Sequence, residues 1–370
     1  MNTLSFDIIK IAAKFSIPGE FVSISCIEAG HINNTYAVCF SDNGKETTYL
    51  LQQININVFK NPDELMSNIT AVTDFLRKKI EADNGDTDRE TLRFFNALNG
   101  KYYYCDNEGR YWRICNFVTD SYSTDFIDKP ETYYNAGAAF GIFQKRLEDF
   151  PSSTLFETIP DFHNTAKRFD ALCEAINKNI AGRLDSVKEE VEFALSNKDT
   201  AYYLVDMVKS GALPIRVTHN DTKLNNVLFD SNTKKALCII DLDTVMPGLS
   251  LYDFGDSIRF AANTAAEDEK DLTKVSLNLE LFEAYVKGYL STAGESLTRK
   301  EIELLPFSAK LMTYECGIRF LTDYLNGDTY FKISYPEHNL DRCRTQFELI
   351  KDIDKKMDTM LELTLSAIEG

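Results

Sequence analysis

The chain has 370 residues, of which 44% are hydrophobic and 26% charged, a composition that is typical of globular proteins and excludes disordered and collagen-like classes. Its 40 basic and 57 acidic side chains give a net charge of −17 at pH 7. Because phosphate backbones and anionic membrane surfaces repel such a chain, we expect no nucleic-acid partner and no membrane partner.

The cysteines, histidines and apolar segments narrow the class further. The eight cysteines contain no C-x-x-C and the four histidines are dispersed, so we expect reduced thiols and neither a disulfide framework nor a zinc site. Asp7 and Lys10 interrupt the N-terminal apolar stretch, and no later segment approaches about 18 uncharged apolar residues. We therefore expect a cytoplasmic protein.

The first third of the chain predicts a small lobe rich in β-structure. Apolar and β-branched runs between turn residues predict strands over residues 21–27, 35–40, 47–54, 101–105 and 111–118. An Asn-Gly pair at Asn43 and Gly44 predicts a hairpin between the second and third of these strands. Asn61 and Pro62 predict the start of a helix, because apolar side chains then recur at helical spacing up to Ile80.

From about residue 131 the chain is predicted to be mostly helical. The helices are expected over residues 131–147, 164–179, 186–210, 277–290, 299–326 and 339–367. A non-helical stretch over residues 213–256 interrupts them. Its two short apolar runs, 226–229 and 236–240, predict a small β-hairpin that carries polar loops.

This non-helical stretch contains the residues that indicate chemistry. His219, Asp221 and Asn226 have the pattern H-x-D-x-x-x-x-N, and Asp241 follows an apolar strand fifteen residues after Asn226. Phosphoryl transfer from ATP needs a carboxylate at the attacking hydroxyl, metal ligands at the phosphates and nearby positive charge. Asp221 can accept the proton or hold the hydroxyl, and Lys223 supplies a cation. Asn226 and Asp241 offer the oxygen ligands that suit Mg²⁺.

The short motif alone fits a polar turn equally well, since Asp and Asn are common in turns. The apolar strand that ends in Asp241 at the right distance favours a phosphotransfer site over a polar turn. His219 is interpreted as a residue that braces the loop through a hydrogen bond. The D-F-G string that begins at Asp253 comes too late for a metal loop, so Asp253 and Asp256 are interpreted as structural acids.

The two-lobed layout and these motifs resemble the aminoglycoside phosphotransferase and choline kinase superfamily, which shares the protein-kinase-like fold. Longer strings resemble one family within it, the N-acetylhexosamine 1-kinases; they include GHINNTY (30–36), HNDTKLNNVLFD (219–230) and IRFLTDYLNGDTYFK (318–332). The resemblance implies an α+β, bilobal fold of the aminoglycoside phosphotransferase type. We expect a nucleotide-binding lobe at residues 1–118, a helical catalytic and substrate lobe at residues 119–370, and a monomer.

The resemblance also implies an activity and roles for residues. N-acetylhexosamine 1-kinases transfer the γ-phosphate of ATP to the anomeric hydroxyl of N-acetylglucosamine or N-acetylgalactosamine. Asp221 would be the catalytic carboxylate, Asn226 and Asp241 the Mg²⁺ ligands, and Asp243 an additional ligand. Arg319 and Tyr330 would bind the sugar, for which an Arg fork and a Tyr hydroxyl are suitable donors. An ion pair and a core aromatic are the structural alternatives for these last two residues.

Four residues between the first two strands occupy the place of a phosphate-covering loop. These residues, which the resemblance assigns to ATP binding, are Gly30, His31, Asn33 and Asn34. One glycine is few for such a loop, and a hairpin turn explains the same residues almost as well. His31 could face either the phosphates or the sugar.

The third strand departs from the superfamily pattern. Kinases carry a Lys there that contacts the α- and β-phosphates and pairs with a helix Glu, whereas this strand has Gln52. A neutral amide can donate hydrogen bonds to phosphate but brings no charge. Phe117 and Val118 would form the hinge whose backbone pairs with adenine, and a plain strand end is the alternative.

Three other functions stay open on the sequence. The first is a kinase for choline, an aminoglycoside or another sugar. Arg319 disfavours a cationic acceptor, because such an acceptor would favour a pocket lined with acidic residues. The second is a pseudokinase, which Gln52 favours and the joint presence of Asp221, Lys223 and Asn226 disfavours. The third and weakest is a metal-dependent hydrolase.

Overall fold

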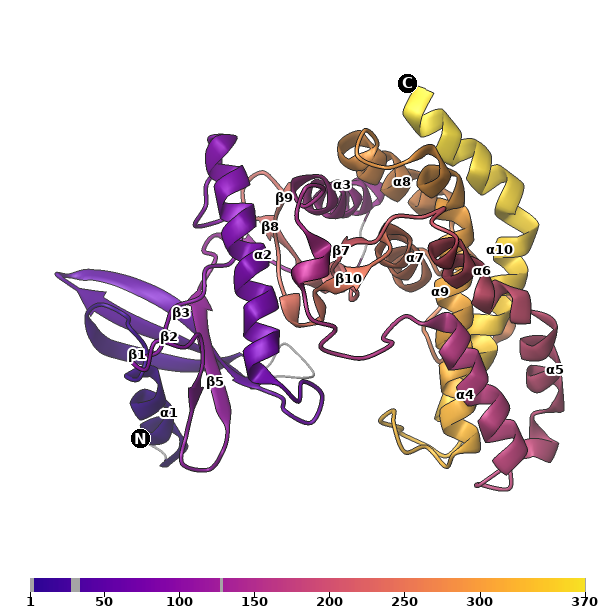
Figure 1. Ribbon diagram of the computed structural model, residues 1–370, viewed down its shortest axis with the longest axis horizontal. Helices are drawn as coiled ribbons and strands as arrows, with labels where there is room; N and C mark the ends of the chain where they lie inside the picture. The colour runs from indigo at the N-terminus through magenta and orange to yellow at the C-terminus, as the bar shows by residue number, and fades with distance from the viewer. Residues whose placement is uncertain (1–2, 28–33, 127–128, 370) are drawn as a thin grey trace.

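A computed structural model of the protein describes residues 3–27, 34–126 and 129–369. A β-rich N-terminal region lies at one side of the molecule and a helical C-terminal region at the other (Figure 1). The long helix α2 (Pro62–Ala82) lies between them. The predicted α+β fold class is confirmed.

The N-terminal region is a five-stranded antiparallel sheet in the order β1-β2-β3-β5-β4. Its strands are β1 (Glu20–Ile27), β2 (Asn34–Asp42), β3 (Lys45–Ile54), β4 (Tyr104–Cys105) and β5 (Tyr111–Asn116). Asn43 and Gly44 have φ of 51° and 81°, so the Asn-Gly pair makes the predicted tight turn between β2 and β3. The first helix, α1 (Thr3–Ala12), was not predicted; Ile8 and Ile11 bury its apolar face in the core of the sheet.

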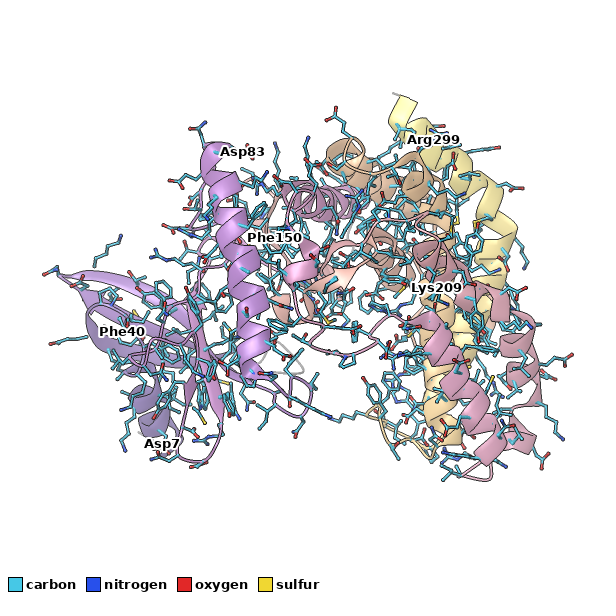
Figure 2. The ribbon with its side chains drawn as sticks, viewed as in Figure 1. Asp7, Phe40, Asp83, Phe150, Lys209 and Arg299 are labelled. Atoms are coloured by element: carbon cyan, nitrogen blue, oxygen red, sulfur yellow. The ribbon has the colours of Figure 1, made fainter. Side chains whose placement is uncertain are left out.

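Helix α2 begins as the sequence predicts. The Asn61 side chain accepts hydrogen bonds from the backbone N–H groups of Asp63 and Glu64, and Pro62 occupies the first turn, where its missing N–H costs nothing. On the side away from the sheet, Phe75 of α2 packs edge-on against Phe150, with 5.2 Å between ring centroids (Figure 2). The helix therefore shares apolar contacts with both regions.

The helical region contains α3 to α10. Their bounds are α3 (Pro130–Arg146), α4 (Thr165–Lys178), α5 (Lys188–Ser196), α6 (Lys198–Lys209), α7 (Ser250–Ala261), α8 (Leu279–Ala293), α9 (Arg299–Leu325) and α10 (His338–Glu369). The long helix predicted over residues 186–210 is wrong in one respect, because Asn197 separates α5 from α6. Both its backbone N–H and its side chain donate to the Phe193 carbonyl at the end of α5. α7 was also not predicted.

The non-helical stretch forms two small sheets beside α2. The predicted hairpin is present as β8 (Val227–Asp230) and β9 (Ala236–Ile239), to which β6 (Ser121–Tyr122) adds a third strand. β7 (Arg216–Thr218) pairs with β10 (Met246–Gly248). Two short 3-10 turns, η3 (Leu224–Asn226) and η4 (Leu242–Thr244), follow the catalytic loop and β9.

One cluster of buried side chains crosses residue 118. It includes Leu65 and Leu76 of α2 together with Phe254 and Phe282 of the helical region. The boundary at residue 118 therefore stays a prediction. All eight cysteines lie within the described residues and carry free thiols. In the part of the chain that the structure describes, no helix is long and apolar enough to span a membrane.

Candidate active site

A buried acid of α7 fixes the loop that carries Asp221. The Asp253 carboxylate is 1% exposed and accepts hydrogen bonds from the backbone N–H groups of His219 (2.9 Å) and Asn220 (2.7 Å). Asn220 has a left-handed backbone with φ of 64°, which Asn adopts more readily than most residues. The conformation of the loop therefore depends on α7, in agreement with the structural role predicted for Asp253.

The buried His219 ring joins the two segments of the site. Its Nε2 lies 2.9 Å from the carbonyl oxygen of Ile240, and its Nδ1 lies 3.3 Å from the backbone nitrogen of Asp221. Both ring nitrogens are thus used within the loop framework. This is the bracing role predicted for His219, and it leaves proton transfer to Asp221.

Asp221 is held by two of the residues predicted to act with it. Lys223 Nζ lies 2.8 Å from Asp221 Oδ1, and Asn226 Nδ2 donates to the Asp221 carbonyl oxygen (2.8 Å) and to Oδ2 (3.3 Å). The Asp221 side chain is 20% exposed, so it can reach a bound acceptor. Because Asn226 donates through its nitrogen, its amide oxygen remains for a cation.

Asp241 follows β9 directly and lies beside the Asp221 loop. The backbone N–H of Ile240 donates to the Asn226 carbonyl (2.9 Å), which brings Asp241 next to Asn226 in space. Burial, and then the carboxylates of Asp243 and Asp221, raise the pKa of Asp241 to about 6. Crowding of negative charge at a buried oxygen ligand is the condition that a bound cation relieves.

The donor set fits Mg²⁺ but not a dense all-protein metal site. Among the described residues, no group of three or more His, Cys, Asp or Glu side chains converges to hold a metal ion. Mg²⁺ is usually bound through one or two carboxylates together with waters and substrate phosphates. Asp241 and the Asn226 amide oxygen suit that mode.

Asp243 lies deeper than its neighbours and has a basic partner. Its carboxylate forms an ion pair with Nη1 of Arg113, and both side chains are at most 4% exposed. Arg113 comes from β5 of the N-terminal sheet, so this pair connects the sheet to the segment after β9. That Asp243 also binds Mg²⁺ stays a prediction.

Sequence reasoning missed Arg113. It stands in the apolar strand Tyr111–Asn116, where a charged residue is unusual, and it is the register partner of Gln52 across β3 and β5. Its Nε donates to Gln52 Oε1 at 3.1 Å. A lone Arg among the apolar residues of a predicted strand was the available signal.

The predicted nucleotide-binding residues are only partly described. Gly30, His31 and Asn33 lie outside the described residues. Asn34 is exposed at the start of β2 and donates to Gln53 Oε1 (3.1 Å). At the predicted hinge the Phe117 ring is 37% exposed and Val118 is 4% exposed, so a ring is available to an adenine while the next residue anchors the segment.

The structure brings the two predicted sugar-binding residues together. The Arg319 guanidinium lies 6.0 Å from the centroid of the Tyr330 ring. Asp323 bends the segment between them, since its carboxylate accepts from the backbone N–H groups of Thr329, Tyr330 and Phe331. Tyr330 is 71% exposed, which excludes the core-aromatic alternative, whereas Arg319 lies 3.6 Å from Glu315 as the ion-pair alternative expects.

A buried His–Glu pair connects this segment to the catalytic loop, and sequence reasoning missed it. His163 Nδ1 lies 3.0 Å from Glu315 Oε1, and its Nε2 lies 3.3 Å from the carbonyl oxygen of Asn220. Burial lowers the pKa of His163, but the carboxylates of Glu315 and Asp256 together raise it by more, so the net shift is upward. Polar contacts thus run from Arg319 through Glu315 and His163 to the carbonyl oxygen of Asn220, the residue before Asp221.

Comparisons with known proteins agree with this fold. The family described as "Phosphotransferase enzyme family" (APH) matches residues 24–293. The fold is similar to that of an aminoglycoside phosphotransferase from Alicyclobacillus acidocaldarius, at 11% identity over 98% of this chain and 96% of that chain, with a TM-score of 0.60. It is similar to Plasmodium vivax ethanolamine kinase at 18% identity over 88% and 82% of the two chains (TM-score 0.54). It is also similar to choline kinase from Cryptosporidium parvum at 14% identity over 96% and 97% (TM-score 0.54).

The kinase-like fold and the family match over residues 24–293 together define a phosphotransferase. The chain belongs to the phosphotransferase enzyme family, whose match covers well over half of it. The predicted fold of the aminoglycoside phosphotransferase type is therefore confirmed.

Proposed function

We propose that the protein is an ATP-dependent N-acetylhexosamine 1-kinase, which transfers the γ-phosphate of ATP to the anomeric hydroxyl of N-acetylglucosamine or N-acetylgalactosamine. The observation that carries the phosphotransfer is the contact of Asp221 with both Lys223 and Asn226, beside Asp241. The membership of the chain in the phosphotransferase family is consistent with ATP as the donor.

Asp221 is the residue that meets the acceptor hydroxyl. An anomeric hydroxyl is more acidic than an ordinary alcohol, so Asp221 acts by holding the oxygen in line as well as by accepting its proton. Lys223 Nζ, 2.8 Å from Asp221 Oδ1, holds the Asp221 carboxylate in place before the acceptor binds. It then offsets the charge that develops on the transferred phosphoryl group.

Asn226 and Asp241 would hold Mg²⁺. When bound there, the ion would supply positive charge to the phosphates of ATP. The Asn226 side chain is oriented for this by its bonds to Asp221, and Asp241 by the left-handed backbone at φ 59° that follows β9. Asp is among the few residues that adopt this conformation readily, which explains its place there.

The sugar assignment rests on Arg319 and Tyr330. A guanidinium 6.0 Å from an exposed Tyr ring offers hydrogen-bond donors for hydroxyl and acetamido oxygens beside a flat apolar face for the pyranose. The same guanidinium disfavours acceptors with a positive charge, such as choline, ethanolamine and aminoglycosides.

A panel of acceptors with ATP and Mg²⁺ tests the proposal. The panel holds both N-acetylhexosamines, their parent hexoses, choline, ethanolamine and an aminoglycoside, and NMR of the product identifies the oxygen that receives the phosphate. We expect turnover on the N-acetylhexosamines with phosphate on the anomeric oxygen, and a loss of about 10²- to 10⁴-fold in kcat for Asp221→Asn.

Each other outcome has a definite meaning. Turnover only on a cationic acceptor, or on another hydroxyl of the sugar, would overturn the acceptor assignment and leave the phosphotransferase standing. Nucleotide binding without turnover on any acceptor would favour the pseudokinase instead.

A further inference from the structure

The cleft side of the N-terminal sheet lacks the cation that kinases place on the third strand. Gln52 stands on β3, and its Nε2 donates to Thr35 Oγ1 at 3.3 Å while its Oε1 accepts from Arg113. Its amide is thus held between two neighbouring strands. Gln52 cannot neutralise the charge of a bound triphosphate.

Arg113 is the only Lys or Arg among the buried residues described before Val118. It is 2% exposed, and its guanidinium lies 5.6 Å from the centroid of the Phe94 ring. Burying such a group is costly unless it is paired, so its retention in an apolar strand needs a reason. One partner, Asp243, lies two residues after the predicted metal ligand Asp241.

The guanidinium of Arg113 has a nitrogen left for a second partner. Nε donates to Gln52 and Nη1 pairs with Asp243, so Nη2 is the nitrogen that neither of these two contacts uses. The guanidinium is also close enough to Asp241 to act on its charge. Planar guanidinium groups bind carboxylates and phosphates with two parallel donors.

We propose that Arg113 supplies from β5 the phosphate-binding charge that β3 lacks, with Gln52 as the residue that positions its guanidinium. The two residues are register partners, so their side chains emerge on the same face of the sheet. In this arrangement the ion pair with Asp243 holds the guanidinium beside the Mg²⁺ site, and its remaining donor reaches the α- or β-phosphate. The inference rests on the proposed use of ATP.

Direct binding of nucleotide tests it without any sugar. The dissociation constants of Mg·ADP and of adenosine are measured by calorimetry for the wild type, Arg113→Gln and Arg110→Gln. Arg110 is the matched control, since it directly precedes β5 but pairs with Asp106 instead of Asp243. We expect Arg113→Gln to weaken Mg·ADP binding about 10- to 100-fold, as for a hydrogen bond to a charged group.

Adenosine separates contact with phosphate from a general structural effect. We expect Arg113→Gln to leave adenosine binding unchanged, since adenosine has no phosphate, whereas a distorted sheet would weaken both ligands. A second variant, Gln52→Lys with Arg113→Gln, returns a cation to the usual strand, and we expect it to recover most of the lost Mg·ADP affinity.

The outcomes are distinguishable. If the wild type does not bind Mg·ADP, the proposed function fails. If the wild type binds and Arg113→Gln binds equally well, the inference fails and the proposed function stands. Equal losses for ADP and adenosine, or a double variant as weak as Arg113→Gln, would make Arg113 only a brace for Asp243. Should Arg113→Gln not fold, Arg113→Lys replaces it: this variant keeps the charge but loses the planar fork, and we expect it to weaken Mg·ADP binding and to leave adenosine binding unchanged.

Discussion

Three buried acids around the Asp221 loop differ in their partners, and the partner decides what each can do. Asp253 accepts from two backbone N–H groups and sets the loop, while Asp243 is paired with Arg113. The pKa of Asp241 is raised to about 6 by burial and by neighbouring carboxylates, so it is the acid that gains most from a cation. The position of the loop thus does not depend on the metal.

The His163–Glu315 pair gives the fold a pH dependence whose sign can be worked out. The pKa of His163 is raised above its ordinary 6.5, so its contribution to stability is present below pH 6.5 and is lost as the pH rises through the folded value. The pKa of Glu315 is lowered from 4.5, because the cations of His163, Arg319 and Arg168 together outweigh burial, so its contribution is lost only at more acidic pH. The pair therefore stabilises the fold most between these two ordinary values.

We predict that His163→Gln removes the fall in the free energy of unfolding between pH 6 and pH 8.5 that the wild type shows. Removing one partner of a buried ion pair should cost about 3 to 5 kcal/mol at pH 6 and less at pH 8.5. Urea unfolding at the two pH values measures the free energy of unfolding of both proteins and so the cost of the variant at each pH. The charged and aromatic groups that face His163 are Glu315, Asp256, Arg319 and Tyr252.

Histidine NMR provides the control for this prediction. Only four histidines are present, so the His163 signal is assigned by its absence in His163→Gln. In Glu315→Gln the His163 pKa should fall, because burial and Arg319 still lower it and only Asp256 is left to raise it. An unchanged pKa in this variant would contradict the assigned cause.

At the scale of elements, close helix contacts hold α7 and with it the catalytic loop. Gly255 lies between Asp253 and the face of α9, and a Cβ at this position would overlap the carbonyl oxygen of Ser308. Gly288 of α8 makes an equally close approach to the carbonyl oxygen of Tyr134 in α3. The first contact lies on the helix that carries Asp253, whereas α3, among the described residues, hydrogen-bonds to Asp253 only through the Gln144 side chain (3.2 Å).

We predict that Gly255→Ala and Gly288→Ala destabilise the fold similarly, by about 1 to 3 kcal/mol, because each forces two helices apart. Only Gly255→Ala should also lower kcat, since it moves Asp253 and thereby Asp221. The measurements are urea unfolding and turnover at a temperature where both variants are folded. Equal kcat values for the two variants would show that the loop does not depend on the packing of α7.

At the scale of the whole molecule, local patterns predicted the elements but not the contacts between distant ones. The Asn-Gly turn, the Asn61 cap and the Asp221 motif depend on neighbours in sequence, and the structure places them as predicted. The role of Arg113 depends on a residue 130 positions away, and that of His163 on one 152 positions away. The spacing of residues within one segment cannot predict pairs between residues so far apart in the sequence.

Helix α2 joins the two regions through a buried amide as well as through apolar packing. Asn68 is 1% exposed; its Nδ2 donates to the carbonyl oxygens of Phe156 (2.7 Å) and Val245 (3.0 Å), and its Oδ1 accepts from the Phe156 N–H (2.8 Å). Val245 directly follows η4. The sheet and the predicted metal-binding segment are therefore expected to unfold together in the wild type.

We predict that Asn68→Ala lowers the free energy of unfolding by about 2 to 4 kcal/mol, because it leaves buried backbone groups without partners. It should also separate two transitions in urea. The single Trp, Trp112 of β5, reports the sheet by fluorescence, while far-UV circular dichroism reports mainly the helices. The two curves should coincide in the wild type and in the exposed control Asn57→Ala, and the Trp112 curve should come first in Asn68→Ala. Coincident curves with an unchanged midpoint in Asn68→Ala would show that apolar packing alone couples the two regions.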